Sequence, residues 1–392
     1  MKAVSLAPLQ VRQWGGHSIT VNICVMKRFI MYVCTLAAII VFAGSHYAHA
    51  CTGIALKAAD GSRIVARTVE WANEAMNCGY AIVPRGHVQR SFTPEGVTGL
   101  EFRASYGYVG IYTDYEQFVV EGVNEAGLSA GLFFFPGFGE YPQFDKKTED
   151  RSISDLQFVS WVLSNFSSIE EVKKGIKDIR VISMDSRIGT VHWRLSEPGG
   201  RIVVLEYKKG EPVFHENPIG TFTNSPGFEF HITNLRNYVN LHAGAAENQL
   251  LGQGTRPENP LELSPLGGGS GMLGLPGDFT PPSRFVRAAF FSMSAPILPT
   301  SFEMVTQAFH ILNNFDIPVG AQHKADQIPQ GLPSATQFTA VTDLSTLRLY
   351  YRTAWNQNIR CLDLKRIDFS KVEYRTNPLD ACKVQPVEMI FQ

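Results

Sequence analysis

Cys51 is the residue of this chain that is best placed to do chemistry by itself. Ahead of it, Ala48-His49-Ala50 has the small-x-small form after which signal peptidase cuts. A cut there turns the planar amide nitrogen of Cys51 into an α-amine with a pKa of about 7.7–8.0. One residue then supplies both the thiol that attacks an acyl carbon and the base that takes the thiol proton. The sequence therefore predicts nucleophilic catalysis by an N-terminal cysteine.

The segment before the cut site has the parts of a secretory signal peptide. Lys27 and Arg28 supply its basic start, and residues 29–43 form an apolar stretch that is short for a transmembrane span. Residues ahead of Met26 add nothing to such a signal, so we expect Met26 to be the true start. We therefore predict that residues 1–50 are removed. The protein is then periplasmic or secreted and touches a membrane only through this transient segment.

Two alternatives for this segment remain open. It could stay attached as a membrane anchor, or Cys51 could be lipidated at the cut site, which would block the amine. Lipidation signals usually carry Leu three residues before the cysteine, where this chain has Ala48. A lipid-anchored or catalytically silent protein that only binds a ligand is therefore the rival from another functional class. The chemical state of the Cys51 amine discriminates between the two.

Composition fits an exported globular protein. The chain holds 35 Lys and Arg against 36 Asp and Glu, and every charged residue within 1–50 is basic. The mature chain is therefore mildly acidic, which argues against a nucleic-acid-binding surface. The absence of a low-complexity linker predicts a single catalytic domain over residues 51–392. Cys361 and Cys382 are the pair that we expect to form a disulfide in an oxidising compartment, although sequence alone does not fix the pairing.

Apolar periodicity assigns strands and helices to most of this domain. Residues 51–57 and 62–67 flank Asp60-Gly61, a strong hairpin signal, so Cys51 is expected to begin one strand of a β-hairpin. Further strands are expected at residues 118–121, 128–135, 190–195, 202–207, 212–215, 336–343, 347–351 and 359–364. Helices are expected at residues 153–165, 167–179, 284–293 and 300–312, the second and fourth opening with a capping box and the third capped by Ser283. This order predicts an α+β domain layered α/β/β/α rather than a parallel βαβ array.

Seven segments in order carry a resemblance to a known family. They are Cys51-Thr-Gly, Ala66-Arg67-Thr-Val-Glu70-Trp71, Glu121-Gly-Val-Asn124-Glu-Ala-Gly127-Leu, Trp161-Val-Leu-Ser-Asn-Phe-Ser-Ser168, Thr223-Asn224-Ser-Pro226, Gly274-Leu-Pro-Gly-Asp-Phe-Thr280-Pro-Pro-Ser-Arg284-Phe and Phe309-His-Ile-Leu-Asn-Asn314. Together they resemble the choloylglycine hydrolases, which include bile salt hydrolases and penicillin V acylases. The resemblance implies a four-layer αββα N-terminal nucleophile (Ntn) hydrolase fold that hydrolyses non-peptide linear amide C–N bonds. It also implies that no metal or other cofactor is needed, and usually a homotetramer.

The resemblance assigns roles to three charged residues. Arg67, on the partner strand of the hairpin, matches the family's active-site arginine, and its guanidinium would favour the thiolate of Cys51. Glu70 falls where the family commonly has Asp, and it is expected to hold the terminal ammonium or to position Cys51. Arg284 opposes the dipole at the start of its expected helix and is also assigned to the site. Without the resemblance, each of the three would be an ordinary surface charge.

The resemblance also implies two donors to the oxyanion of the tetrahedral intermediate. One is the side chain of Asn224, which would otherwise be an ordinary turn residue. The other is a backbone N–H within residues 130–136, a block one residue longer than in many relatives. Phe133 is the expected donor, with an ambiguity of one residue.

The sequence therefore predicts an amidase that cleaves N-acyl amides such as conjugated bile salts or penicillin V, with N-acyl homoserine lactones as the alternative substrate. Aromatic residues suit an apolar acyl pocket, although they could equally belong to the core. The candidates are Trp71, Phe134, Phe135 and Tyr141. Residues 267–271 lack the Lys-Ser/Thr of a phosphate loop, and the histidines show no zinc-ligand spacing. Those histidines are His192, His231, His242 and His310.

Overall fold

The computed structural model describes residues 49–185 and 189–391. The expected start at Met26, and the expected signal peptide apart from its last two residues, lie outside the described residues. None of the helices in the described part of the chain is long and apolar enough to cross a membrane.

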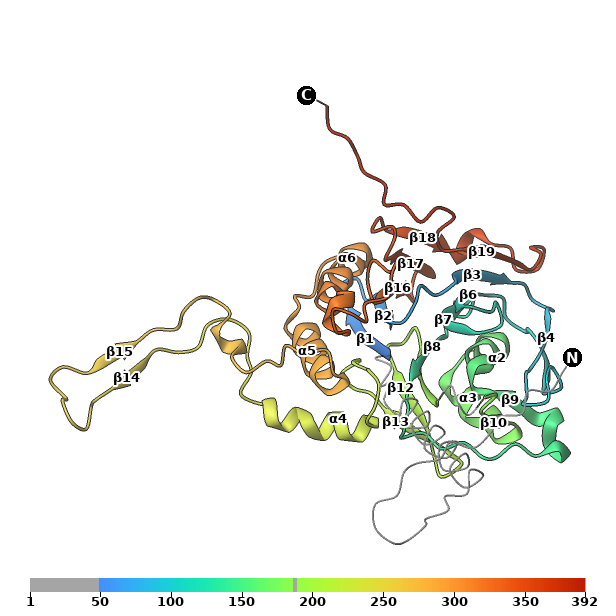
Figure 1. The fold of residues 1–392 in the computed structure, drawn as a ribbon, viewed down its shortest axis with the longest axis horizontal. Coiled ribbons are helices and arrows are strands. Elements are labelled where there is room, and N and C mark those ends of the chain that lie inside the picture. Colours follow the sequence, from blue (N-terminus) through green and yellow to red (C-terminus); the bar gives the residue numbers. More distant parts are fainter. Residues whose placement is uncertain (1–48, 186–188, 392) are drawn as a thin grey trace, which may run out of the picture. The chain divides into compact units, whose positions relative to one another are not determined.

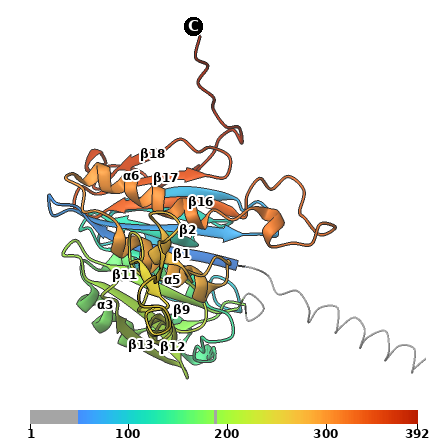
Figure 2. The same cartoon turned by 90° about the vertical axis from the view of Figure 1, so that its left-hand side faces the viewer.

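Two large antiparallel sheets form adjacent layers of the described chain (Figures 1 and 2). The five-stranded sheet has the order β1 (His49–Lys57), β2 (Arg63–Trp71), β16 (Thr336–Asp343), β17 (Arg348–Thr353) and β18 (Arg360–Asp363). The eight-stranded sheet has the order β13 (Glu211–Glu216), β12 (Ile202–Lys208), β11 (Val191–Ser196), β8 (Ser129–Phe134), β7 (Val119–Asn124), β6 (Tyr108–Thr113), β3 (Cys78–Val83) and β19 (Arg375–Pro378).

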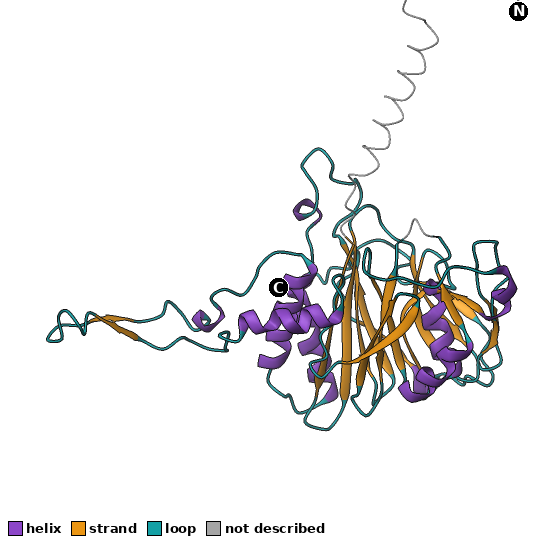
Figure 3. Cartoon of the chain, turned by 90° about the horizontal axis from the view of Figure 1, so that it is seen from below, coloured by secondary structure: helices purple, strands orange, loops and turns teal. Residues whose placement is uncertain are grey.

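Helices lie on both sides of the pair of sheets (Figure 3). Helices α5 (Pro281–Ser294) and α6 (Ser301–Leu312) pack on the five-stranded sheet through β1, β2 and β16. On the other side, α2 (Phe158–Asn165) packs on β7 and β8 of the eight-stranded sheet. The predicted α/β/β/α layering is therefore confirmed.

Shorter elements complete the described chain. Three two-stranded sheets are formed by β4 (Val88–Arg90) with β5 (Glu101–Arg103), β9 (Ser152–Ser154) with β10 (Arg180–Ile182), and β14 (Gln249–Leu251) with β15 (Leu261–Leu263). Two further α-helices are α3 (Ile169–Gly175) and α4 (Phe228–Asn234). Short 3-10 helices lie at Lys146–Arg151, Asp155–Gln157, Ile176–Asp178, Leu235–Tyr238, Ser270–Met272, Asn313–Phe315, Val319–Ala321 and Leu364–Arg366.

The predicted hairpin at the start of the domain is formed by β1 and β2. Its turn places Gly61 at a φ of 91°, a left-handed conformation that glycine adopts without strain. The side chain of Asp60 accepts a hydrogen bond from the backbone N–H of Ser62 at 2.9 Å. The register pairs Cys51 with Val69 and Ala50 with Glu70. This register fixes which residues of β2 share a face with the cysteine.

The start of helix α6 agrees with the sequence prediction, whereas that of α5 does not. The capping box predicted at Thr300 and Glu303 is present at the start of α6. At α5, however, the first residue is Pro281, and Ser283 donates its hydroxyl to Asp278 instead of capping the helix. Proline suits a first helical turn because its missing N–H would have no partner there.

Two more helix starts, those of α2 and α3, differ from the sequence prediction. Helix α2 begins at Phe158 rather than at residue 153, because Ser152–Ser154 forms strand β9 against β10. Apolar periodicity could not detect this strand, since its partner lies about 28 residues further along the chain. At α3 the capping residue is Ser168, not Ser167, and its hydroxyl accepts from the N–H of Glu171.

The hydrophobic core has two main parts, divided by the five-stranded sheet. Side chains alternate between the two faces of a strand. Along β2, Ile64 and Ala66 pack with residues of α5 and α6, whereas Val69 packs with Leu132 and other residues of the eight-stranded sheet. Cys51, the partner of Val69 in the register, therefore points toward the eight-stranded sheet.

The disulfide expected between Cys361 and Cys382 is not formed: both are exposed free thiols. Cys361 lies on β18 in the five-stranded sheet, opposite Tyr350. Cys382 follows β19, which pairs with β3 in the eight-stranded sheet. Asp380, two residues before Cys382, forms an ion pair with Arg360 of β18, so the two segments are adjacent without a bond between their sulfur atoms.

Candidate active site

Cys51 is buried near the start of β1. Its side chain packs with Phe133 of β8 and Phe222 in a small apolar cluster between the sheets. The backbone of β1 continues past it, with Gly53 N–H donating to Phe222 O at 2.6 Å. The cysteine is therefore held on a rigid strand rather than on a loop, which suits a group that must meet a reacting carbon accurately.

Charges on both sides of β1 act on the thiol. Burial raises the pKa of the Cys51 thiol, and Arg67 provides the largest opposing effect. Glu70 raises this pKa further, whereas Arg284 and the backbone N–H of Phe134 lower it. Two cations and one backbone amide thus favour the thiolate, whereas burial favours the neutral thiol.

Arg67 is locked beneath the thiol on the same face of the sheet. Its Nη1 donates to Leu132 O at 2.5 Å and to Val120 O at 3.0 Å. The guanidinium carbon lies 3.9 Å from the centre of the Phe133 ring. Nη1 also lies 3.8 Å from the buried carboxylate of Glu121. These contacts fix the charge in place. Arg67 is therefore not the surface residue that it would be without the family resemblance.

Arg284 reaches the other side of β1 from the first turn of α5. Its Nη1 donates to Cys51 O at 2.6 Å and to Thr52 Oγ1 at 2.8 Å. Its Nη2 donates to Asn224 Oδ1 at 2.8 Å. The side chain is fully buried, and these three acceptors explain why a cation is present where both burial and the helix dipole disfavour it.

Asn224 joins the nucleophile, the second arginine and the oxyanion region. Its Oδ1 accepts from the backbone N–H of Cys51 at 2.7 Å as well as from Arg284. Its Nδ2 donates to Phe134 O at 2.8 Å. An amide nitrogen carries two hydrogens, so the second remains available to an oxyanion.

The backbone N–H that faces the thiol belongs to Phe134, one residue after the predicted Phe133. Phe135 N–H donates to Thr190 O, beside β11, at 2.7 Å. Because backbone N–H groups alternate between the two edges of a strand, that of Phe133 also faces β11. Phe134 faces the opposite edge, where the last residue of β8 paired with β7 is Gly131. This pairing pattern is non-local, and for that reason the sequence left one residue of ambiguity.

Glu70 is a buried carboxylate with no hydrogen bond of good geometry among the described residues, although the Thr68 hydroxyl lies close enough to lower its pKa. Burial raises its pKa to about 7, against the opposing charge of Arg284. In the register it pairs with Ala50, which is itself buried against Ala72, Ile317 and Ala335. A carboxylate with unused acceptors therefore lies beside the residue that processing would remove.

The aromatic candidates for an acyl pocket divide into two groups. Trp71 and Phe134 are half-buried at the ends of β2 and β8. Phe135 is instead fully buried and stacks on His192 with ring centres 4.1 Å apart. Tyr141 is a core residue whose hydroxyl hydrogen-bonds the backbone of β11. Phe135 and Tyr141 are thus packed as core residues, and their contact with substrate stays a prediction.

Two histidines that show no metal-ligand spacing in the sequence contact the backbone at Thr223 and Asn224. His231 Nε2 is 2.8 Å from Asn224 O, and His192 Nε2 is 3.0 Å from Thr223 O. Within the described residues there is no group of three or more His, Cys, Asp or Glu side chains that could hold a metal ion. No sequence signal marks these contacts, since His192 lies 31 residues before Thr223 on another strand, and the separation of seven residues between Asn224 and His231 matches no single strand or helix.

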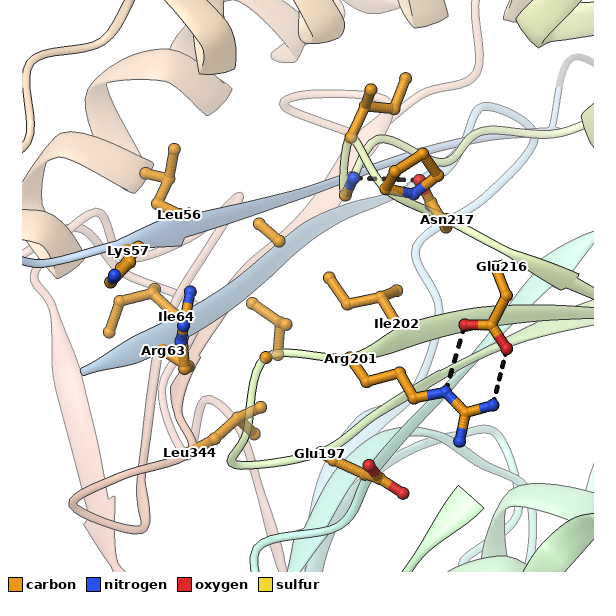
Figure 4. A pocket seen from close by; sticks show the side chains of 16 residues that line it. Leu56, Lys57, Arg63, Ile64, Glu197, Arg201, Ile202, Glu216, Asn217 and Leu344 are labelled. Carbon is orange, nitrogen blue, oxygen red and sulfur yellow. Dashed lines mark hydrogen bonds and ion pairs between the residues drawn. The ribbon is translucent and has the colours of Figure 1, made fainter. Parts of the chain in front are cut away.

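A cavity of about 340 Å³ lies at the other end of the β1–β2 hairpin (Figure 4). Its lining includes Lys57, Arg63, Arg201 and Glu216, and Arg201 and Glu216 form an ion pair there. None of the residues around Cys51 described above lines it. This cavity is therefore separate from the candidate active site.

Comparison with known proteins agrees with this geometry. The family model of linear amide C–N hydrolases, choloylglycine hydrolase family, matches residues 51–378. A bile salt hydrolase/transferase from Clostridium perfringens is 32% identical over 332 residues, covering 83% of this chain and 96% of that protein. A penicillin V acylase from Pectobacterium atrosepticum is 26% identical and covers 88% of this chain and 89% of its own length.

Solved structures show the same fold. A variant of conjugated bile acid hydrolase from Clostridium perfringens superposes with a TM-score of 0.73 at 29% identity, covering 87% of this chain and all of that one (100%). A penicillin V acylase from Agrobacterium tumefaciens gives a TM-score of 0.66 at 22% identity, covering 84% and 92% of the two chains. The predicted four-layer αββα Ntn-hydrolase fold is thereby confirmed.

Proposed function

Because this chain belongs to the choloylglycine hydrolase family and is an amidase of that family, we propose that its nucleophile is Cys51, made N-terminal by removal of residues 1–50. The observation that carries the proposal is the convergence of four groups on one residue. Asn224 contacts the nitrogen of Cys51, Arg284 its carbonyl oxygen, and Arg67 and the Phe134 N–H act on its thiol. The family match also begins at this cysteine.

The proposed reaction begins with proton transfer from the thiol to the α-amine. The thiolate sulfur then attacks the acyl carbon, a C–S bond forms, and the carbonyl π electrons move to oxygen. The oxyanion accepts hydrogen bonds from the free Nδ2 hydrogen of Asn224 and from the Phe134 N–H. As the C–N bond breaks, the α-ammonium gives its proton to the departing amine. Water then hydrolyses the thioester and restores the thiol.

Removal of Ala50 is required by this chemistry for two reasons. The Ala50–Cys51 peptide nitrogen is an amide and cannot act as a base. Ala50 also fills the space beside the cysteine, packed against Ala72, Ile317 and Ala335. Processing creates an ammonium next to Glu70, whose two oxygens have unused acceptor capacity. Glu70 thus takes the ammonium as its partner, in place of the shorter Asp that the family commonly uses.

We propose N-acyl amides with a bulky apolar acyl half as the substrates. The relatives named above support conjugated bile acids and penicillin V as the first two classes to test, with N-acyl homoserine lactones third. The half-buried Trp71 and Phe134 supply aromatic surface beside the site, and burial of apolar area contributes about 25 cal/mol per Å². An amine half facing solvent gains little from such burial, so the enzyme should tolerate changes there.

The test of this proposal is kcat/KM for a matched series of amides that share one leaving amine. Phenoxyacetyl, long-chain acyl and steroid acyl amides should be cleaved faster than the acetyl amide. Acetyl amides or ordinary peptides as best substrates would contradict the proposed substrate class. The location is tested by finding which cell fraction contains the protein. The proposal puts it in the periplasm or in the medium.

We further propose that the protein self-associates through the β14–β15 hairpin. In its register Leu251 pairs with Leu261 and Gln249 with Leu263, so three leucines share one face. Each of the three is about half exposed (49%, 60% and 46%). Exposed apolar surface of this kind marks an interaction site. The proposed partner is a second copy of this chain, in keeping with the homotetramer that the family resemblance implies.

A further inference from the structure

We propose that His231 and His192 are positioning residues that hold the Thr223-Asn224 backbone, so that the Asn224 side chain is already aimed at the oxyanion. The inference rests on the proposed function, because it gives Asn224 the role of oxyanion donor. It adds residues that do not touch the reacting atoms and act only through Asn224.

His231 holds the backbone carbonyl of Asn224 from α4. Its Nε2 is 2.8 Å from Asn224 O, and a carbonyl can only accept, so Nε2 carries the hydrogen. The ring is buried and stacks on Phe285 with centres 4.6 Å apart and planes 9° from parallel. Burial lowers the pKa of His231 to about 4, so near neutral pH this ring has a single N–H. That N–H is used on Asn224.

His192 holds the preceding carbonyl from β11. Its Nε2 lies 3.0 Å from Thr223 O, and its ring is stacked on Phe135 and fully buried. On its other edge, Nδ1 lies 3.5 Å from Glu206 Oε1. Consecutive carbonyls at residues 223 and 224 are therefore each held by an imidazole, from two different elements.

Glu206 links the two histidines. Its Oε1 accepts from the backbone N–H of Phe228 at 2.7 Å, at the start of the helix that carries His231. Its Oε2 lies 3.1 Å from Lys208 Nζ and 3.4 Å from His215 Nε2. Although burial opposes it, the neighbouring His192 and His215 and the Phe228 N–H hold the pKa of Glu206 well below its usual range. A buried carboxylate thus anchors the start of the helix that carries His231 and lies beside the ring of His192.

The consequence concerns the geometry of the transition state. An oxyanion donor helps only when it is within hydrogen-bond distance of the oxygen as charge develops there. A misplacement of about 1 Å can slow a reaction about 10²-fold. Without the His231 N–H, Asn224 O loses its partner and the residue is free to rotate away from the Phe134 and Arg284 contacts. The loss should therefore appear in kcat, with little change in KM.

Two substitutions of His231 separate the hydrogen bond from the packing. His231→Gln keeps a donor near the position of Nε2 but loses the ring stack on Phe285. His231→Phe keeps the stack and loses the donor. We expect His231→Phe to lower kcat about 10- to 100-fold with KM within about 2-fold, and His231→Gln to retain at least about a third of the wild-type kcat. His310→Phe, an exposed site on α6, is the matched control and should change neither. Equal losses in both His231 variants, or a loss in KM alone, would overturn the inference.

A double-mutant cycle tests whether His231 acts through Asn224. In an Asn224→Ala background, His231→Phe should cause almost no further loss of kcat, because the group that it positions is gone. Multiplying losses in the double variant would mean that His231 acts by another route, and would contradict the inference.

Crystal structures of the two His231 variants give a readout without substrate. Asn224 should leave its contacts with Arg284 and Phe134 in His231→Phe and keep them in His231→Gln. If wild-type protein cleaves none of the amides, the proposed function fails, while these structures still decide the positioning claim. An Asn224 side chain unmoved in His231→Phe would refute that claim even in a fully active enzyme.

Discussion

Glu70 is the charged group beside Cys51 whose environment would change most under the proposed processing. Arg67 and Arg284 are both engaged by backbone carbonyls and side chains, whereas both oxygens of Glu70 lack a hydrogen bond of good geometry among the described residues. Burial makes such a carboxylate unfavourable, and Arg284 and Arg67 offset this only in part, since the pKa of Glu70 stays raised. Under the proposed processing, the ammonium created at Cys51 supplies a further cation beside it.

Glu70→Asp should accordingly retain more activity than Glu70→Ala, because only the second variant removes the carboxylate that partners the ammonium. We expect Glu70→Ala to lose about 10-fold or more in kcat/KM, and Glu70→Asp to lose clearly less. Steady-state kinetics on the best amide of the panel provides the check. Near-native activity in both variants would place Glu70 outside the catalytic machinery.

The pH dependence of stability follows from the same residue in the unprocessed chain. The pKa of Glu70 is raised from 4.5 to about 7, so folding favours its protonated form. Stability from this group is therefore complete below about pH 4.5 and is lost as the pH rises toward and through 7. At about 1.4 kcal/mol for each pKa unit, the loss approaches about 3 kcal/mol.

Urea unfolding of protein that retains residues 49–50 should show this decline between pH 5 and 8. Glu70→Gln should flatten it, and the comparison isolates Glu70 from Asp155, whose pKa burial also raises to about 7. Parallel pH profiles for the two proteins would contradict the assignment. In processed protein the ammonium should lower the pKa of Glu70 and reduce the decline.

At the scale of elements, the close approach of β1 to its neighbours explains the glycine in Cys51-Thr-Gly. A Cβ on Gly53 would lie 3.0 Å from the Phe133 ring and 3.4 Å from Phe222 O. That ring also lies under the Arg67 guanidinium. A side chain at this position would therefore disturb packing and the fixed charge together.

Gly53→Ala should lower the free energy of unfolding by about 1–3 kcal/mol, as overpacking does in a filled core. Gly199→Ala is the matched control, since nothing lies within 4 Å of its Cβ position. It should change stability by less than about 0.5 kcal/mol. Chemical denaturation measures both, and equal effects would show that the contact with Phe133 does not constrain β1.

Local signals predicted those elements whose residues interact with near neighbours in the chain. The hairpin turn at Asp60-Gly61 and the capping box at Thr300 are of this kind, and both are present. Features set by pairing between distant segments were missed or shifted. The choice between the Phe133 and Phe134 amides depends on β11, and the start of α2 depends on the pairing of β9 with β10. The support of Asn224 by His231 spans only seven residues, but it joins a loop to the helix that follows it, so no strand or helix periodicity indicates it.

On the scale of the whole molecule, the leucines of the β14–β15 hairpin predict the oligomeric state. Leu251, Leu261 and Leu263 share one face, while Leu250 pairs with Glu262 on the other. Light scattering of wild-type protein should give the mass of a tetramer. The double variant Leu251→Glu with Leu261→Glu should have a lower mass in solution, and Leu250→Glu should lower the mass less. A monomeric wild type, or a tetramer indifferent to the paired change, would contradict this role for the hairpin.

The central claim is that Cys51, with a free α-amine, forms the acyl-enzyme. Intact mass of exported protein, quenched during turnover of the best amide, tests it most directly. We predict a chain of residues 51–392 that carries one acyl group, located on the Cys51 sulfur and released by hydroxylamine. The acyl group should be absent from Cys51→Ala. Retention of residues 27–50, a diacylglyceryl adduct on Cys51, or an acyl group on another residue would contradict the account.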